Sequence, residues 1–91
     1  MRYDWDEKKE AANITKHGVF FAEAASVFDD FLSVTFADPD HSVDEKRLII
    51  LGQSNRQRLL FVSHTDRDGE TRITSAREAT RRERKVYEET S

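Results

Sequence analysis

The spacing of apolar residues changes once along this chain, and that change restricts its fold more than any other feature. Before Asp30, apolar residues follow the i, i+3, i+4, i+7 spacing of one helix face: Phe21, Ala24, Ala25 and Phe28. Beyond Asp30, apolar residues alternate with polar ones, as in a strand with one polar face: Leu32, Val34 and Phe36. Helices followed by a run of strands indicate an α+β fold.

Residues that favour helix ends define the first helix. Asp6 suits an N-cap and Gly18 suits a left-handed C-terminal position, which predicts a helix from Asp6 to His17. The preceding segment, Arg2–Trp5, is typical of a short strand. A second helix is expected over about Phe21–Phe28, where it would contribute to the core.

Four strands are predicted after the helices, over about residues 32–36, 47–51, 59–65 and 70–77. Asp66 to Gly69 forms the hairpin turn between the last two, because Asp-Gly favours such turns. The apolar run Leu59–Val62 indicates a central strand. Thr80 and Glu83 have the spacing of a capping box, which predicts a final helix from Thr80.

These elements predict one domain over residues 1–91. We expect a curved antiparallel sheet of about four to five strands, packed with two N-terminal helices and one C-terminal helix. The chain has no cysteine, so disulfides and thiolate metal sites are excluded. No apolar run approaches the roughly 20 residues that cross a bilayer. We therefore expect a soluble, cytoplasmic protein without membrane contact.

Charge is distributed unevenly along the chain. Residues 1–45 carry 4 Lys and Arg side chains against 11 Asp and Glu, whereas residues 46–91 carry 11 against 7. Arg72–Lys85 alone holds six cations and two anions. Guanidinium groups where a strand meets a helix N-terminus suit phosphate binding, so this segment predicts a polyanion partner, most simply RNA. The alternative is a solvated helix face with interspersed glutamates.

Arg77 is the candidate phosphate clamp, assisted by Arg72 and Arg81. Further RNA contacts are expected from the final helix, at Arg81, Arg82, Arg84 and Tyr87. Strict strand alternation would turn Arg77 inward with Ile73, unless the strand bulges or ends before it. The sequence leaves that question open.

His64 is the candidate general acid or base, because imidazole titrates near neutral pH. Its position in phase with Leu60 and Val62 supports the alternative that it lies at the edge of the core. Tyr87 also has an alternative role, which is to pack the final helix on the sheet together with Val86. An acidic loop around His41, over residues 38–45, suggests a hard-metal site but lacks ligand spacing, so we expect no metal and no cofactor.

Three segments together resemble the BrnT toxins of bacterial type II toxin–antitoxin systems. They are Trp5–Lys9 with Asn13–Gly18, then Phe21–Asp30, and lastly Ile73–Arg84 with Tyr87. The resemblance implies a RelE-like fold, a ribonuclease that arrests translation, and a BrnA antitoxin that neutralises the toxin and binds operator DNA. The C-terminal signature of the family matches Ser75–Arg77 and Arg81–Arg84, and His64 matches a histidine common in close relatives. Phe20 departs from the small polar residue that many members carry there.

We therefore expect a metal-independent endoribonuclease that uses the 2′-hydroxyl of RNA as nucleophile and leaves a 2′,3′-cyclic phosphate. The partners implied are RNA, a BrnA-like antitoxin encoded by the adjacent gene, and operator DNA only through the antitoxin complex. The alternative is a non-catalytic module that binds a partner and nucleic acid in a transcriptional autoregulatory complex. It would show salt-dependent binding without strand scission.

Overall fold

The computed structural model describes residues 2–38 and 46–90. Its sheet has five strands: β1 (Arg2–Trp5), β2 (Val34–Ala37), β3 (Arg47–Gln53), β4 (Leu59–Arg67) and β5 (Glu70–Glu78). The helical segments are α1 (Glu7–His17), α2 (Phe21–Ser26), the 3-10 turn η1 (Val27–Asp29) and α3 (Arg81–Thr90). The α+β prediction is confirmed. Among the described residues, no helix is long and apolar enough to cross a membrane.

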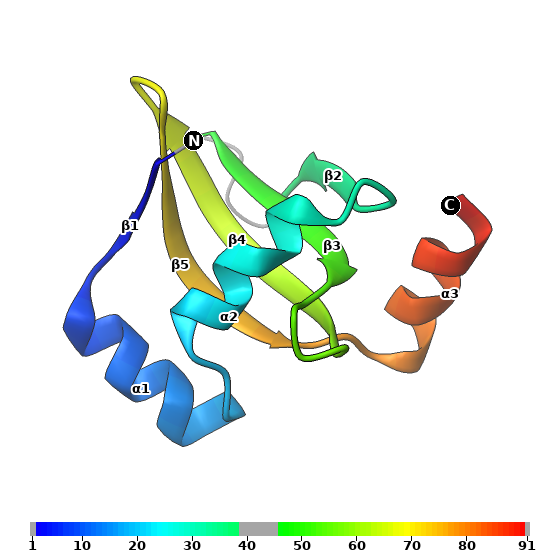
Figure 1. Ribbon diagram of the computed structural model, residues 1–91, viewed down its shortest axis with the longest axis horizontal. Coiled ribbons are helices and arrows are strands. Elements are labelled where there is room, and N and C mark those ends of the chain that lie inside the picture. Colours follow the sequence, from blue (N-terminus) through cyan, green and yellow to red (C-terminus); the bar gives the residue numbers. More distant parts are fainter. Residues whose placement is uncertain (1, 39–45, 91) are drawn as a thin grey trace.

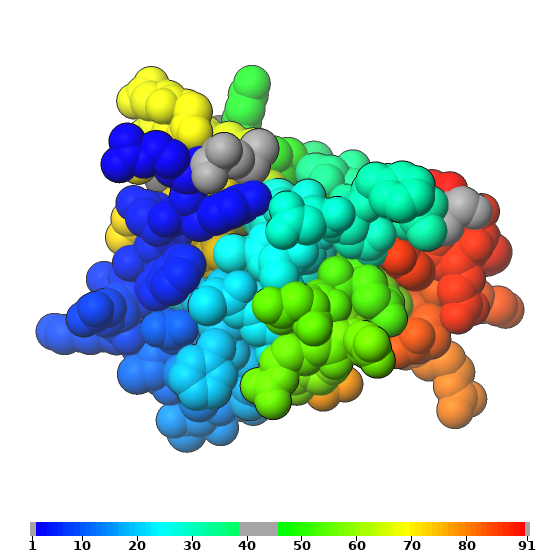
Figure 2. Space-filling model, viewed as in Figure 1, coloured from blue at the N-terminus to red at the C-terminus, as the bar shows by residue number. Residues whose placement is uncertain are grey.

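The strands lie in the order β1-β5-β4-β3-β2, so β4 is central as expected (Figure 1). The neighbours β5, β4, β3 and β2 pair antiparallel, whereas β1 pairs parallel with β5. In Figure 1, α1 and α2 lie on one face of the twisted sheet, and α3 follows the end of β5 at the side. We call the face under α1 and α2 the inner face and the opposite one the outer face. Figure 2 shows α2 beside the loop after β3.

The helix ends agree with the residues that predicted them. The Asp6 side chain accepts hydrogen bonds from the backbone of Lys8 and Lys9 at 2.8 and 3.0 Å. Gly18 ends α1 in the left-handed conformation, with φ 69°. The Thr80 backbone N–H donates to the Glu83 carboxylate at 2.8 Å, and the Glu83 N–H donates to the Thr80 hydroxyl at 3.2 Å. The predicted capping box is thus confirmed.

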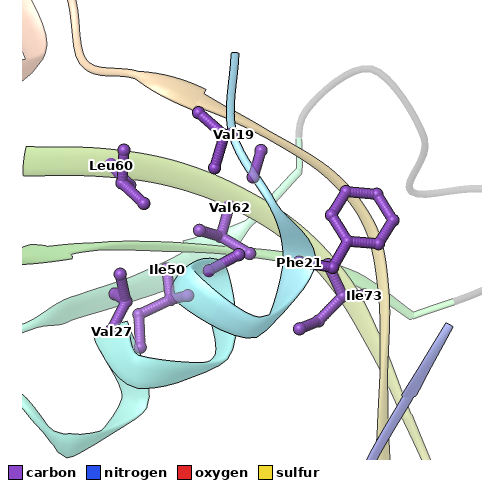
Figure 3. Close-up of a cluster of buried hydrophobic side chains, with 9 residues drawn as sticks. Val19, Phe21, Val27, Ile50, Leu60, Val62 and Ile73 are labelled. Atoms are coloured by element: carbon purple, nitrogen blue, oxygen red, sulfur yellow. The ribbon is translucent and has the colours of Figure 1, made fainter. Parts of the chain in front are cut away.

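The core lies between the inner face and the helices. It consists of nine buried residues: Val19, Phe21, Ala24, Val27, Ile50, Leu60, Val62, Ile73 and Ala76. Figure 3 labels seven of them and shows side chains from the helical segment meeting those from the strands. Burial of this apolar area supplies the main driving force for folding and fixes which residues of β3, β4 and β5 face inward.

A bulge in β5 settles the open question about Arg77. Ser63 pairs with Ser75, but the next residue of β4, His64, pairs with Ile73, so Thr74 is an extra residue. The extra residue lets Ile73 and Ala76 both face the core, although they are three positions apart. Arg77 therefore points to the outer face.

Some element boundaries differ from the prediction. The second helix is α-helical only to Ser26, and Asp30 then ends the 3-10 turn by donating its N–H to the Val27 carbonyl at 3.1 Å. Its side chain also accepts from the Leu32 N–H at 3.0 Å, so Leu32 lies in a turn and β2 begins at Val34. Most of the acidic loop considered for a metal, residues 39–45, lies outside the described residues.

Candidate active site and RNA-binding groove

An open groove of about 490 Å³ lies on the outer face, between the strands and the first turns of α3. We call it the outer groove. Its lining combines aromatic, hydroxyl and charged side chains from β2–β5, α3 and the segment after β2: Phe36, Asp38, Arg47, Ile49, Phe61, Ser63, Ser75, Arg77, Arg82, Glu83 and Val86. Three arginines against two carboxylates leave it with one net positive charge, which suits an anionic ligand.

Arg77 is held in the outer groove by three neighbours. Its Nη1 and Nη2 donate to the two Glu83 carboxylate oxygens at 2.8 and 2.9 Å, and Nη1 also donates to the Glu78 carbonyl at 3.2 Å. The guanidinium carbon lies 4.1 Å from the centroid of the Phe61 ring, in a cation–π arrangement. These contacts fix the plane of the guanidinium group.

Arg77 keeps part of its donor capacity. A guanidinium group has five N–H donors. Both hydrogens of Nη1 and one of Nη2 are used, so Nε–H and the second hydrogen of Nη2 have no acceptor in the described part of the chain. These two donors form one edge of the planar group, and its side chain is 34% exposed. That edge can bind two oxygens of a phosphate.

Glu83 is the ionised partner of Arg77, so it does not act as a proton donor. Burial favours its neutral form, but hydrogen bonds from Arg77 and from the Thr80 backbone outweigh burial and lower the pKa of Glu83. The hydrogen bonds that Arg77 donates to Glu83 raise the pKa of Arg77, against the effect of burial. Both side chains therefore stay charged across the physiological range.

The structure does not bring His64 together with Arg77, which corrects the expected grouping. His64 points to the inner face and is 2% exposed, with its ring 4.9 Å from the Phe28 ring in an edge-on contact. Burial lowers the pKa of His64 and outweighs the raising effect of Asp66. The alternative position at the core is therefore the one observed, because Leu60, Val62 and His64 share the inward phase of β4.

Arg72 also lies apart from Arg77. It faces outward before the bulge, at the opposite end of β5, where it forms an ion pair with Asp4 of the neighbouring β1 at 3.0 Å. Both side chains are about half exposed. Arg72 lines a smaller separate pocket with Asp4, Thr65, Arg67, Asp68 and Glu70. An assisting role beside Arg77 has no support in this geometry.

The residues expected from the final helix divide into three groups. Arg82 lines the outer groove beside Arg77. Arg81 and Arg84 are exposed on α3 and are not part of the groove lining. Tyr87 donates its hydroxyl to the Asp30 carboxylate at 2.6 Å, and burial followed by this bond raises its pKa to about 12. Tyr87 thus fastens α3 to the turn before β2, in line with its alternative packing role.

No cluster of three or more His, Cys, Asp or Glu side chains that could hold a metal ion occurs among the described residues. The donors that converge in the outer groove are guanidinium and hydroxyl groups. Ser63 and Ser75 are directly opposite each other on β4 and β5, next to Arg77. This chemistry suits the binding of phosphate and ribose oxygens.

Comparison with known proteins now assigns the chain. The family described as "Ribonuclease toxin, BrnT, of type II toxin-antitoxin system" matches residues 5–83. The chain belongs to the BrnT family. A crystal structure of the Brucella abortus ribonuclease toxin BrnT is similar with a TM-score of 0.71 and 30% sequence identity. The match covers 89% of this chain and 99% of that one. No curated protein matches the chain.

BrnT membership confirms the resemblance drawn from the three segments, and it confirms the fold. It also makes this chain a ribonuclease toxin of a type II toxin–antitoxin system, with RNA as target and an antitoxin as partner. The non-catalytic module is therefore the less supported interpretation. The match includes β5 and the first turn of α3, which carry Arg77, Arg82 and Glu83.

Sequence reasoning missed two residues of this BrnT groove. From the sequence, Phe61 belongs only to a central apolar strand, and Glu83 to a helix cap, a solvated helix face and the C-terminal signature, without a role beside Arg77. Both contact Arg77 because the bulge turns Arg77 to the outer face. Alternation along the strand indicates the position of Phe61: it lies between Leu60 and Val62, which face inward, so its side chain faces outward.

Proposed function

We propose that this BrnT toxin is a metal-independent endoribonuclease in which Arg77 binds the scissile phosphate. The observation that carries the proposal is the held guanidinium of Arg77, which lines a positively charged groove and keeps two N–H donors without a partner in the described part of the chain. Two preorganised N–H donors can neutralise phosphate charge without a metal ion. Arg82 borders the same groove, and Arg81 and Arg84 extend the positive charge along α3 toward the flanking RNA backbone.

The proposed reaction is an internal transesterification. The 2′-oxygen forms a bond to phosphorus while the bond from phosphorus to the 5′-oxygen breaks. The 2′-hydroxyl loses its proton, and the leaving 5′-oxygen gains one, so the products are a 2′,3′-cyclic phosphate and a 5′-hydroxyl. Negative charge on the phosphoryl oxygens is greatest during this exchange. Donors fixed before the reaction stabilise that charge most effectively, which is the role we give to Arg77.

We assign the biological effect and partners by family. RNA cleavage in the cytoplasm would arrest translation, and a BrnA-like antitoxin encoded by the adjacent gene would neutralise the toxin. Operator DNA would be bound only through the toxin–antitoxin complex. Family membership supports an antitoxin and an RNA target, and the identity of the antitoxin as BrnA-like is part of the proposal.

Growth arrest tests this function in the cell. Wild-type toxin, Arg77→Ala and the loop control Arg56→Ala are expressed from an inducible promoter, with and without the adjacent antitoxin gene. We expect arrest by wild type and Arg56→Ala, relief by the antitoxin, and growth with folded Arg77→Ala. Arrest by Arg77→Ala equal to that by wild type would contradict the role of Arg77.

A further inference from the structure

We infer that Phe36 is a stacking platform for one base of the RNA, beside the phosphate bound by Arg77. The inference rests on the proposed function, because it places a nucleotide in the outer groove. Phe36 lies on the edge strand β2 and lines the groove across from α3. Phe36 is 36% exposed on this edge strand, where charged residues are common in other proteins.

Phe36 and the Arg77 guanidinium lie no farther apart than about the length of one nucleotide. Arg77 covers the Phe61 ring at 4.1 Å, and the Phe61 and Phe36 ring centroids are 6.3 Å apart with an interplanar angle of 63°. The distance from the Arg77 guanidinium to the Phe36 ring therefore cannot exceed the sum of these two distances, about 10 Å. A nucleotide has this size from its phosphate to the far side of its base.

The two aromatic residues of the groove, Phe61 and Phe36, have different roles. Arg77 occupies one side of the Phe61 ring, so Phe61 positions the guanidinium group. Phe36 meets the Phe61 ring at 63°, lines the groove and is partly exposed. Arg47, on the neighbouring strand β3, also lines the groove, two residues before the Ile49 that pairs with Phe36. An aromatic surface bordered by arginines is the arrangement that binds unpaired bases and their phosphates.

This arrangement defines the substrate class as single-stranded RNA. A base can lie on Phe36 only after it leaves its neighbours in a helix, and a duplex would have to open first. Stacking tolerates every base, because each has a π-face. Phe36 should therefore contribute affinity for unpaired RNA with little sequence preference.

Binding of a 2′-O-methylated oligonucleotide tests the inference, because the blocked 2′-oxygen prevents cleavage during the measurement. Its affinity is measured as a single strand and as a duplex with wild type, Phe36→Ala, Phe36→Leu and Phe36→Trp. Phe36→Leu keeps apolar bulk but removes the π-face. The control is Phe31→Ala, since Phe31 is 93% exposed and lies outside the groove lining. Circular dichroism confirms that each variant is folded.

We expect Phe36→Ala and Phe36→Leu to weaken single-strand binding by roughly 5- to 150-fold, the range for loss of one stacked base. Phe36→Trp and Phe31→Ala should bind as wild type, and the duplex should bind weakly to all. Unchanged single-strand binding by Phe36→Leu would overturn the inference, even where RNA cleavage still depends on Arg77. Loss of antitoxin binding in that same variant would assign the groove to the protein partner instead. Cleavage independent of Arg77 would refute the proposed function separately.

Discussion

Arg77 and Glu83 are joined by two parallel hydrogen bonds of 2.8 and 2.9 Å across the junction of β5 and α3. Glu83 is also the last residue of the four-residue capping box that begins at Thr80. The start of α3 and the orientation of the guanidinium group are therefore fixed by the same carboxylate. This links a local helix signal to the chemistry of the outer groove.

Arg77→Lys should lower RNA cleavage by about 10²- to 10³-fold, the usual cost of losing one oriented donor to developing charge. An ammonium ion keeps the charge but cannot bind Glu83 and a phosphate through two planar edges. Single-turnover cleavage of end-labelled RNA measures the effect, with Arg56→Lys on the exposed loop as the control. Activity of Arg77→Lys near the wild-type rate would show that only charge matters at this position.

Tyr87→Phe should lower the free energy of unfolding by about 1–2 kcal/mol, because the Asp30 carboxylate loses a hydroxyl donor at 2.6 Å. Urea denaturation measures this change, and hydrogen exchange should rise mainly in α3. Tyr3→Phe is the matched control, since the Tyr3 hydroxyl has no hydrogen-bond partner among the described residues. Equal stabilities for the two variants would mean that this bond does not fasten α3.

Asn13→Ala should lower the free energy of unfolding by about 2–4 kcal/mol. Its buried amide accepts from the Ala76 N–H at 3.1 Å and donates to the Ala76 and Val19 carbonyls at 2.8 and 3.0 Å. β1 pairs with β5 only as far as Ile73, so the Asn13 amide takes the place of a strand beyond that point. Thermal and urea unfolding test the loss, which Asn55→Ala in the exposed loop should not show. A change below about 0.5 kcal/mol would argue that water replaces the amide.

Stability should fall as the pH drops below the usual His64 pKa of 6.5. Burial lowers the folded-state pKa, so the unfolded chain binds the proton first, and each further pH unit costs up to about 1.4 kcal/mol until the folded pKa is reached. Above pH 6.5, His64 does not change the pH dependence of stability. Denaturation between pH 5 and 7.5 should show this slope in wild type and a smaller one in His64→Leu. Identical slopes would place the acid sensitivity elsewhere.

Local signals in the sequence predicted most elements of the fold. Asp6, Gly18 and the Thr80–Glu83 pair mark helix ends because they satisfy backbone groups nearby in the chain. The parallel pairing of β1 with β5 joins segments about 68 residues apart, as the Asp4–Arg72 bond shows, and no local pattern contains it. The sequence thus gave no basis for placing Asp4 beside Arg72.

The candidate site was predicted less completely than the fold. Arg77 and Arg82 both line the outer groove, as expected for a phosphate site. The face of the sheet to which Arg77 points depends on one extra residue, Thr74, in β5. For His64, alternation in phase with Leu60 and Val62 supported the core position, and the contact with Phe28 on the inner face agrees with it rather than with a catalytic place beside the arginines. Bulges and tertiary packing decide such orientations, and neither has a reliable local signature.

The most direct test of the account is the chemistry of the RNA ends. Purified wild type and Arg77→Ala are incubated with end-labelled single-stranded RNA at low salt in the presence of EDTA, and the fragment ends are identified. We expect fragments with 2′,3′-cyclic phosphate and 5′-hydroxyl ends from wild type, and intact RNA with Arg77→Ala. Cleavage that requires added metal, or cyclic-phosphate fragments from Arg77→Ala at the wild-type rate, would contradict it.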